Sequence, residues 1–164
     1  MIGPEENYCD RNNGTLVGEY RSTAEQMYYP YVRPQENGHH TDTRWLTLKQ
    51  KNGKGLAVYA DGTMEFNSLR NSVEDFDGEE ATSRDYQWNN RDAEELKHDI
   101  RTAKDIKPRQ THINDITPRD FVEVCLDMRQ MGVGGFDSWG SIPDPQYLIP
   151  ANKEYRWGFT IVPM

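Results

Sequence analysis

The sequence is short of the aliphatic residues that usually build a core. Leu, Ile, Val and Phe together make up 29 of 164 residues, about 18%. A fraction below about 20%, combined with a net charge of −8, is typical of disordered chains. Nine Tyr and four Trp compensate, because each brings a large apolar face with one polar group. We therefore expect a folded chain with the length of one domain.

Positive charge and long apolar runs are also scarce. The 19 Lys and Arg face 27 Asp and Glu, and this balance argues against a nucleic-acid or anionic membrane partner. No apolar run approaches the ~20 residues that a membrane span needs. Residues 1–6 have neither the basic nor the apolar region of a signal peptide. We expect no nucleic-acid and no membrane partner.

Residues that could bind a metal or form a disulfide are few. Cys9 and Cys125 lack the spacing of a metal site, and we expect packed free thiols rather than a disulfide. His39, His40 and Asp42 stand close together in sequence. However, adjacent residues of a strand point to opposite faces, so the two histidines are badly placed to share a metal. We interpret these three residues as part of a solvated loop.

Most of the chain has strand patterning. Residues 44–49 and 55–60 flank an Asn-Gly hairpin signal at 52–53, and an Asp-Gly pair at 61–62 predicts a second hairpin before a strand over 64–69. Alternating residues predict further strands over 122–128 and 155–162. Residues 1–43 indicate loops and short strands. The fold class that follows is all-β.

One segment has a different period. Asp92 followed by Glu95 matches a capping box. Apolar residues then recur at helical spacing, at Ala93, Leu96, Ile100 and Ala103. The pattern predicts one amphipathic α-helix near 92–106.

Acidic residues are too abundant for any pair to stand out as catalytic. Glu5, Glu6, Asp10 and Glu36 are possible general acids. A retaining glycosidase needs two carboxylates about 5–5.5 Å apart, a separation that sequence spacing does not define. We interpret the acidic run over 74–80 as a hydrated loop.

The run Gly-Val-Gly-Gly at 132–135 is followed by Phe-Asp-Ser-Trp rather than by the Lys-Ser/Thr of a phosphate-binding loop. Two interpretations stay open. The glycines could form a tight loop with positive φ angles. They could also let Trp139 project from a rim, where its face would pack against a pyranose ring.

Three segments together carry a resemblance to a known family. They are GPEENYCDR at 3–11, PYVRPQENG at 30–38 and MGVGGFDSW at 131–139. They resemble, in order, the motifs G-P-x-E-N-Y-x-D-R, P-Y-x-x-P-x-E-N-G and M-G-[IV]-G-G-x-x-S-W in the C-terminal, small-chain domain of bacterial glycoside hydrolase family 2 β-galactosidases. The likeness runs from about residue 3 to the C-terminus, with a gap at about 80–108.

The resemblance implies an antiparallel β-supersandwich like that of galactose mutarotase. Residues 1–164 would form a single, partial domain, the C-terminal half of that sandwich. The catalytic glutamates would lie in an upstream TIM barrel, so this chain would hold no catalytic residue. Trp139 matches the tryptophan that contacts the substrate on its aglycone side, whereas Phe136 replaces the usual Asp of the loop.

The resemblance also implies the partners. The substrate would be a terminal β-D-galactoside such as lactose, reached through the barrel. This chain would hold no cofactor and no metal, since the Mg²⁺ and Na⁺ that the family often uses lie in other domains. Self-association or an oligomeric parent is expected, and the sequence does not distinguish the bacterial cytoplasm from the periplasm. The alternatives are a stand-alone carbohydrate-binding module and an aldose-epimerase-like domain.

Overall fold

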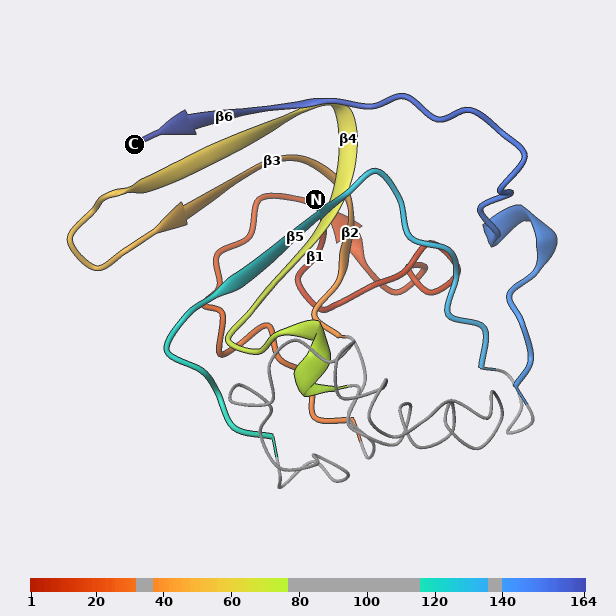
Figure 1. The fold of residues 1–164 in the computed structure, drawn as a ribbon, viewed down its shortest axis with the longest axis horizontal. Helices are drawn as coiled ribbons and strands as arrows, with labels where there is room; N and C mark the ends of the chain where they lie inside the picture. The colour runs from red at the N-terminus through yellow and green to blue at the C-terminus, as the bar shows by residue number, and fades with distance from the viewer. Residues whose placement is uncertain (32–36, 77–115, 136–139) are drawn as a thin grey trace, which may run out of the picture.

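The computed structural model describes residues 1–31, 37–76, 116–135 and 140–164 (Figure 1). Its strands are β1 (Ile2–Gly3), β2 (Leu16–Val17), β3 (His40–Lys49), β4 (Gly55–Leu69), β5 (Glu123–Asp127) and β6 (Phe159–Pro163). Two short 3₁₀ turns, η1 (Val73–Asp75) and η3 (Pro145–Tyr147), complete the described elements. The helix predicted near 92–106 and Trp139 lie outside the described residues.

All described strand pairs are antiparallel, and β4 is the central strand of the main sheet, since β3, β5 and β6 all pair with it. On one side β4 pairs with β3 along nearly its whole length. On the other side β6 pairs with its first half and β5 with its second half. Figure 1 shows β4 turning between these halves. The small β1–β2 sheet lies against β3, which gives two layers and confirms the all-β sandwich.

The hairpin at Asn52-Gly53 is confirmed, because residues 50–54 connect β3 to β4. The second hairpin, at Asp61-Gly62, is wrong, since β4 runs through this pair without reversing. The extra residues form a bulge: Tyr59 pairs with Trp45, whereas the next β4 partner, Met64, pairs with Thr43. The Asp61 amide donates to the Gly158 carbonyl over 2.9 Å. This contact holds β4 beside the start of β6.

The apolar core is small and is formed by side chains of the neighbouring strands β3 and β4. Leu46, Val58, Met64 and Phe66 form its buried centre. Leu126 of β5 packs against it, as do the side chains of Met1, Met27, Leu48, Leu56 and Ala60. The aromatic contribution is smaller than expected, because the two described tryptophans, Trp45 and Trp157, are 45% and 40% exposed.

The strands at 122–128 and 155–162 are confirmed with shorter bounds. Residues 155–158 precede β6 and lie outside it. All five β6 residues are exposed, and Ile161 is 53% exposed. Among the described residues, no helix has the length and apolarity to cross a membrane.

Candidate functional site

The three sequence motifs meet in space, and Glu6 joins the first to the second. Its Oε1 accepts a hydrogen bond from Arg11 Nη2 over 2.6 Å and another from the Tyr31 hydroxyl. Its Oε2 accepts from the Gly38 amide over 2.8 Å. The Glu6 side chain is only 7% exposed. A carboxylate surrounded by three donors orders the loops, which is a poor arrangement for a general acid.

Asn7 fixes the first motif to the start of β3. It is fully buried, and its amide group donates to the carbonyls of Ile2 and Glu5. Its Oδ1 accepts from the backbone and hydroxyl of Thr41. The Asn7 backbone amide donates to the His39 carbonyl over 2.8 Å. All hydrogen-bonding groups of the buried side chain therefore have partners, as burial requires.

Both residues of the Asn-Gly pair in the second motif, Asn37 and Gly38, have a structural role. Asn37 bonds both backbone groups of Tyr29. Gly38 has a φ of +71°, and a Cβ there would lie 2.7 Å from the Met27 carbonyl oxygen and 2.8 Å from Leu69 Cδ2. Only glycine fits this position without strain.

The third motif is held by Asp10. We call residues 131–135 the glycine loop. The Val133 amide donates to Asp10 Oδ1 over 3.1 Å, and the Gly134 amide donates to Asp10 Oδ2 over 2.9 Å. Gly134 and Gly135 have φ angles of +61° and +83°, which confirms the tight-loop interpretation. Successive amides that converge on an anion form a nest. Here the anion is the chain's own Asp10.

Gly132 makes the approach of Asp10 possible. A Cβ at this position would lie 2.5 Å from Asp10 Oδ2 and 2.9 Å from the Tyr147 Cβ. The Gly132 amide donates to the Tyr147 carbonyl over 2.9 Å. The glycine thus serves close packing of the loop between the first motif and η3.

A second carboxylate, Glu65 of β4, holds the residue just before the glycine loop. Glu65 Oε2 accepts from the Gln130 amide over 2.6 Å and lies 2.9 Å from His39 Nε2. The Cys9 thiol donates to the Gln130 carbonyl over 3.6 Å. Burial raises the pKa of the Cys9 thiol, which keeps it protonated as a donor. Cys9 and Cys125 are free thiols, as expected.

The interpretation of His39 and His40 as part of a solvated loop is wrong. They are 0% and 3% exposed, because His39 immediately precedes β3 and His40 begins it, both under the first motif. His39 stacks on Tyr8 with ring centroids 5.2 Å apart. His40 stacks on Phe66, and burial lowers its pKa to about 4. The two rings thus contact different parts of the molecule. No group of three or more metal-binding side chains occurs in the part of the chain that the structure describes.

The acidic run over 74–80 is also not simply hydrated where it is described. Asp75 is 2% exposed and accepts two hydrogen bonds from Arg119, over 2.6 and 2.7 Å. Its Oδ2 also accepts from the Ser72 amide over 3.0 Å, which caps η1. Residues 77–80 lie outside the described residues, as does the candidate acid Glu36.

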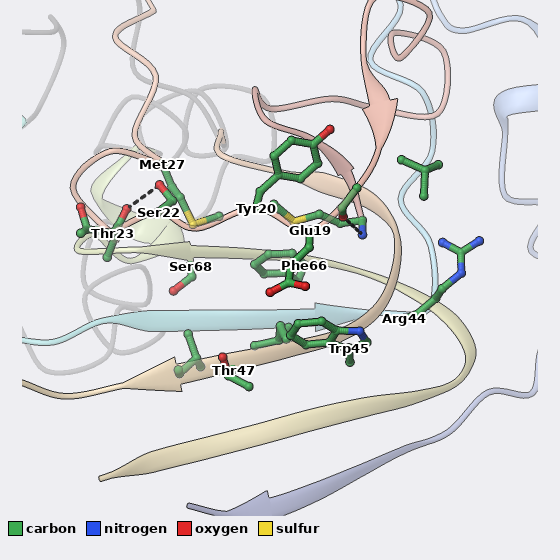
Figure 2. A pocket seen from close by; sticks show the side chains of 16 residues that line it. Glu19, Tyr20, Ser22, Thr23, Met27, Arg44, Trp45, Thr47, Phe66 and Ser68 are labelled. Carbon is green, nitrogen blue, oxygen red and sulfur yellow. Dashed lines mark hydrogen bonds between the residues drawn. The ribbon is translucent and has the colours of Figure 1, made fainter. Parts of the chain in front are cut away.

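A pocket of about 330 Å³ lies between β3 and the segment that follows β2. Figure 2 shows Tyr20 and Trp45 on opposite sides of it, with Phe66 and Ser68 of β4 also lining it. Glu19 and Arg44 add charged groups. Sequence reasoning missed this pocket because residues 17–27 carry no motif, and only folding brings them to β3.

Comparison with known proteins gives a consistent result. The family model described as the β-galactosidase small chain matches residues 2–161. A β-galactosidase of Priestia megaterium is 30% identical over 162 residues, which cover 99% of this chain and 13% of the relative. The β-galactosidase BgaC of Bifidobacterium adolescentis is 33% identical over 159 residues, covering 92% of this chain and 12% of the relative. The chain therefore spans about an eighth of the length of these curated relatives.

Proposed function

The chain belongs to the β-galactosidase small-chain family, and from that premise we propose that it is a non-catalytic part of a retaining β-galactosidase. In this proposal it contributes Trp139 to the substrate site of an upstream catalytic domain. The parent enzyme hydrolyses terminal β-D-galactosides such as lactose. The isolated chain is inactive, and any metal that the parent uses is bound outside this chain.

The observation that carries the proposal is the attachment of the glycine loop. Two carboxylates, Asp10 and Glu65, bind the backbone amides of residues 130, 133 and 134. A loop that only connects two strands does not need this anchoring, whereas a loop that orients a substrate must be held in place. Trp139 follows the loop by four residues and occupies the tryptophan position of the family motif.

The chemistry of the carboxylates supports a non-catalytic role. Glu6 and Asp10 each accept hydrogen bonds from protein groups at both carboxylate oxygens, and the buried Glu65 has its Oε2 bonded to the Gln130 amide and to His39 Nε2. A nucleophile or a general acid must instead face the substrate with a free oxygen. These three residues order loops, which supports the proposal that the bond-breaking chemistry lies elsewhere in the parent.

The test is Trp139→Ala in the full-length parent enzyme. Loss of an aromatic wall that orients the substrate should raise KM, most of all for lactose and other substrates with a bulky aglycone. The melting temperature should stay nearly unchanged. Trp157→Ala is the matched control, because it removes an indole whose ring packs against Phe159 of β6.

The outcome that contradicts the assignment is a large fall in melting temperature with KM unaltered. Truncating a buried tryptophan typically costs about 3–5 kcal/mol, and such a result would make Trp139 a core residue. A KM rise of equal size in Trp157→Ala would also contradict a specific role of Trp139.

The pocket favours a second candidate function, carbohydrate binding by the chain itself. Aromatic faces such as those of Tyr20 and Trp45 pack well against sugar rings, and polar groups at Glu19 and Arg44 could bind hydroxyls. A calorimetric titration of the isolated chain with lactose tests this function. Binding that Trp45→Ala abolishes and Trp157→Ala preserves would support it, and no heat of binding would refute it.

A further inference from the structure

We propose that the outer edge of β3 is a self-association surface, at which β3 pairs in antiparallel orientation with β3 of a second copy of this chain. Thr47 lies opposite its own copy in this pairing, on a two-fold axis. The proposal goes beyond the proposed function and does not depend on it, because it concerns only β3 and the residues around it.

The hydrogen bonds along β4 show which backbone groups of β3 point outward. Gly55 and Met164 exchange two backbone hydrogen bonds, over 2.8 and 3.1 Å, so the backbone groups of Gly55 point away from β3. Successive residues of an antiparallel strand direct their backbone groups to alternate sides. Residues 56 and 58 of β4 therefore bond to β3, where their partners are Leu48 and Leu46.

By the same alternation, the outward backbone groups of β3 belong to Trp45, Thr47 and Lys49. All three residues are exposed, and within the described ranges their outward groups have no hydrogen-bond partner. The start of the edge is covered instead, since the Asn7 side chain accepts a hydrogen bond from the Thr41 amide. An open edge of this kind is a template for a further strand.

The pocket between β3 and the segment after β2 provides room beside this edge. Five consecutive β3 residues, Arg44 to Leu48, line it. Consecutive residues of a strand point to opposite faces, so a pocket that touches all five extends along the edge of the strand. Figure 2 shows Trp45 and Thr47 on β3 at this pocket.

The β3 sequence is complementary to itself in the register that places Thr47 on the two-fold axis. Trp45 then lies opposite Lys49 of the second copy, where an ammonium group can contact the indole face. Leu46 lies opposite Leu48 of the second copy. Thr–Thr and apolar cross-strand pairs stabilise antiparallel strands, and each outward pair exchanges both of its N–H···O bonds.

This match defines the register and favours a second copy as the partner. A register centred on Leu46 would place Trp45 opposite Thr47 and would lose the contact of the indole with the lysine. The other edge of the sheet, at β6, is less suited to strand pairing. Because Met164 bonds to Gly55, the neighbouring Pro163 is directed outward, and proline has no N–H to donate.

The test is the oligomeric state of residues 1–164, measured by sedimentation equilibrium over a range of protein concentrations. We expect a monomer–dimer equilibrium. Thr47→Lys places two ammonium groups opposite each other on the two-fold axis and should raise the Kd of the dimer at least about tenfold. Thr160→Lys is the matched control, because Thr160 is an exposed threonine of β6, and it should leave the Kd unchanged.

A second pair of variants tests the contact between Trp45 and Lys49. Lys49→Gln removes the cation and should raise the Kd about fivefold, because each dimer contains two such contacts. Lys51→Gln is the control, since Lys51 lies in the turn between β3 and β4, and it should have no effect. Equal effects of the two variants would contradict the register.

Hydrogen exchange of the unchanged chain gives a readout that needs no variant to fold. The outward amides of Trp45, Thr47 and Lys49 should become protected as the protein concentration rises. The amides of Leu46 and Leu48 bond to β4 and should be protected at all concentrations.

Three results would overturn the proposal. They are a monomer at all concentrations, equal weakening of the dimer by Thr47→Lys and Thr160→Lys, and outward amides that exchange equally fast in monomer and dimer. None of these measurements involves the substrate or Trp139, so the proposed function stands or fails separately.

Discussion

Acid should destabilise this chain in part through one buried histidine. His40 is 3% exposed, its ring stacks on Phe66, and its Nδ1 lies 3.4 Å from the Ile2 carbonyl oxygen. Burial disfavours the charged imidazolium, and the pKa of His40 falls from the usual 6.5 to about 4. The nearby His39 and the chain's amino terminus act in the same direction.

The sign of the effect follows from the two pKa values. Between pH 6.5 and about 4, the unfolded chain binds a proton at His40 and the folded chain does not. The unfolded state therefore holds more protons, and the free energy of unfolding falls as the pH falls through this window. At about 1.4 kcal/mol per pKa unit, the full loss from His40 is about 3 kcal/mol.

Urea denaturation at pH 7.5, 6, 5 and 4 measures this loss, with wild type and His40→Leu at the same protein concentration. Leu cannot bind a proton, and all other titrating groups are common to both chains. The wild type should lose about 3 kcal/mol more than His40→Leu between pH 7.5 and 4. Parallel curves for the two chains would refute the assignment of this acid sensitivity to His40.

Other predictions concern buried charge, a special glycine and exposed strands. Arg119→Met should lower the free energy of unfolding by about 3–5 kcal/mol in urea denaturation, because Asp75 stays buried without the Arg119 guanidinium. A decrease below about 1 kcal/mol, the size expected for a surface ion pair, would contradict this prediction. Gly38→Ala should destabilise the folded chain by more than about 1 kcal/mol. Gly14→Ala is the control and should be nearly neutral, because no atom lies within 4 Å of the new Cβ. Equal effects of the two variants would show that the positive φ of Gly38 is unimportant. The isolated chain should self-associate in light scattering, because β6 leaves apolar groups such as Ile161 exposed. A monomer with high thermal stability would show instead that residues 1–164 form a self-sufficient domain.

Local sequence signals predicted the parts of the fold that depend on neighbouring residues. Asn52-Gly53 forms the β3–β4 turn because its turn preference acts within a few residues. Asp61-Gly62 carries a similar signal but forms a bulge, since β4 pairs with β3 on both sides of it, with β6 before it and with β5 after it. β6 comes almost a hundred residues later, and no local pattern indicates that it pairs with β4.

The buried polar groups were the hardest part to predict. His39 and His40 look like loop residues because their partners, Glu65 and the Ile2 carbonyl, are supplied by other strands. Asp10 was one of four candidate acids, and only the folded chain brings its carboxylate to the amides of Val133 and Gly134. The repeated glycines over 132–135 were the usable signal, because they indicate backbone that another group must approach closely.

In the proposed function, this chain serves a β-galactosidase without performing its chemistry. The most direct test is hydrolysis of nitrophenyl β-D-galactoside by the full-length parent and by purified residues 1–164, at equal molar concentration. We predict turnover by the parent and no turnover above buffer by the isolated chain, since a retaining mechanism needs two carboxylates that face the substrate. Robust turnover by residues 1–164 alone would contradict the account.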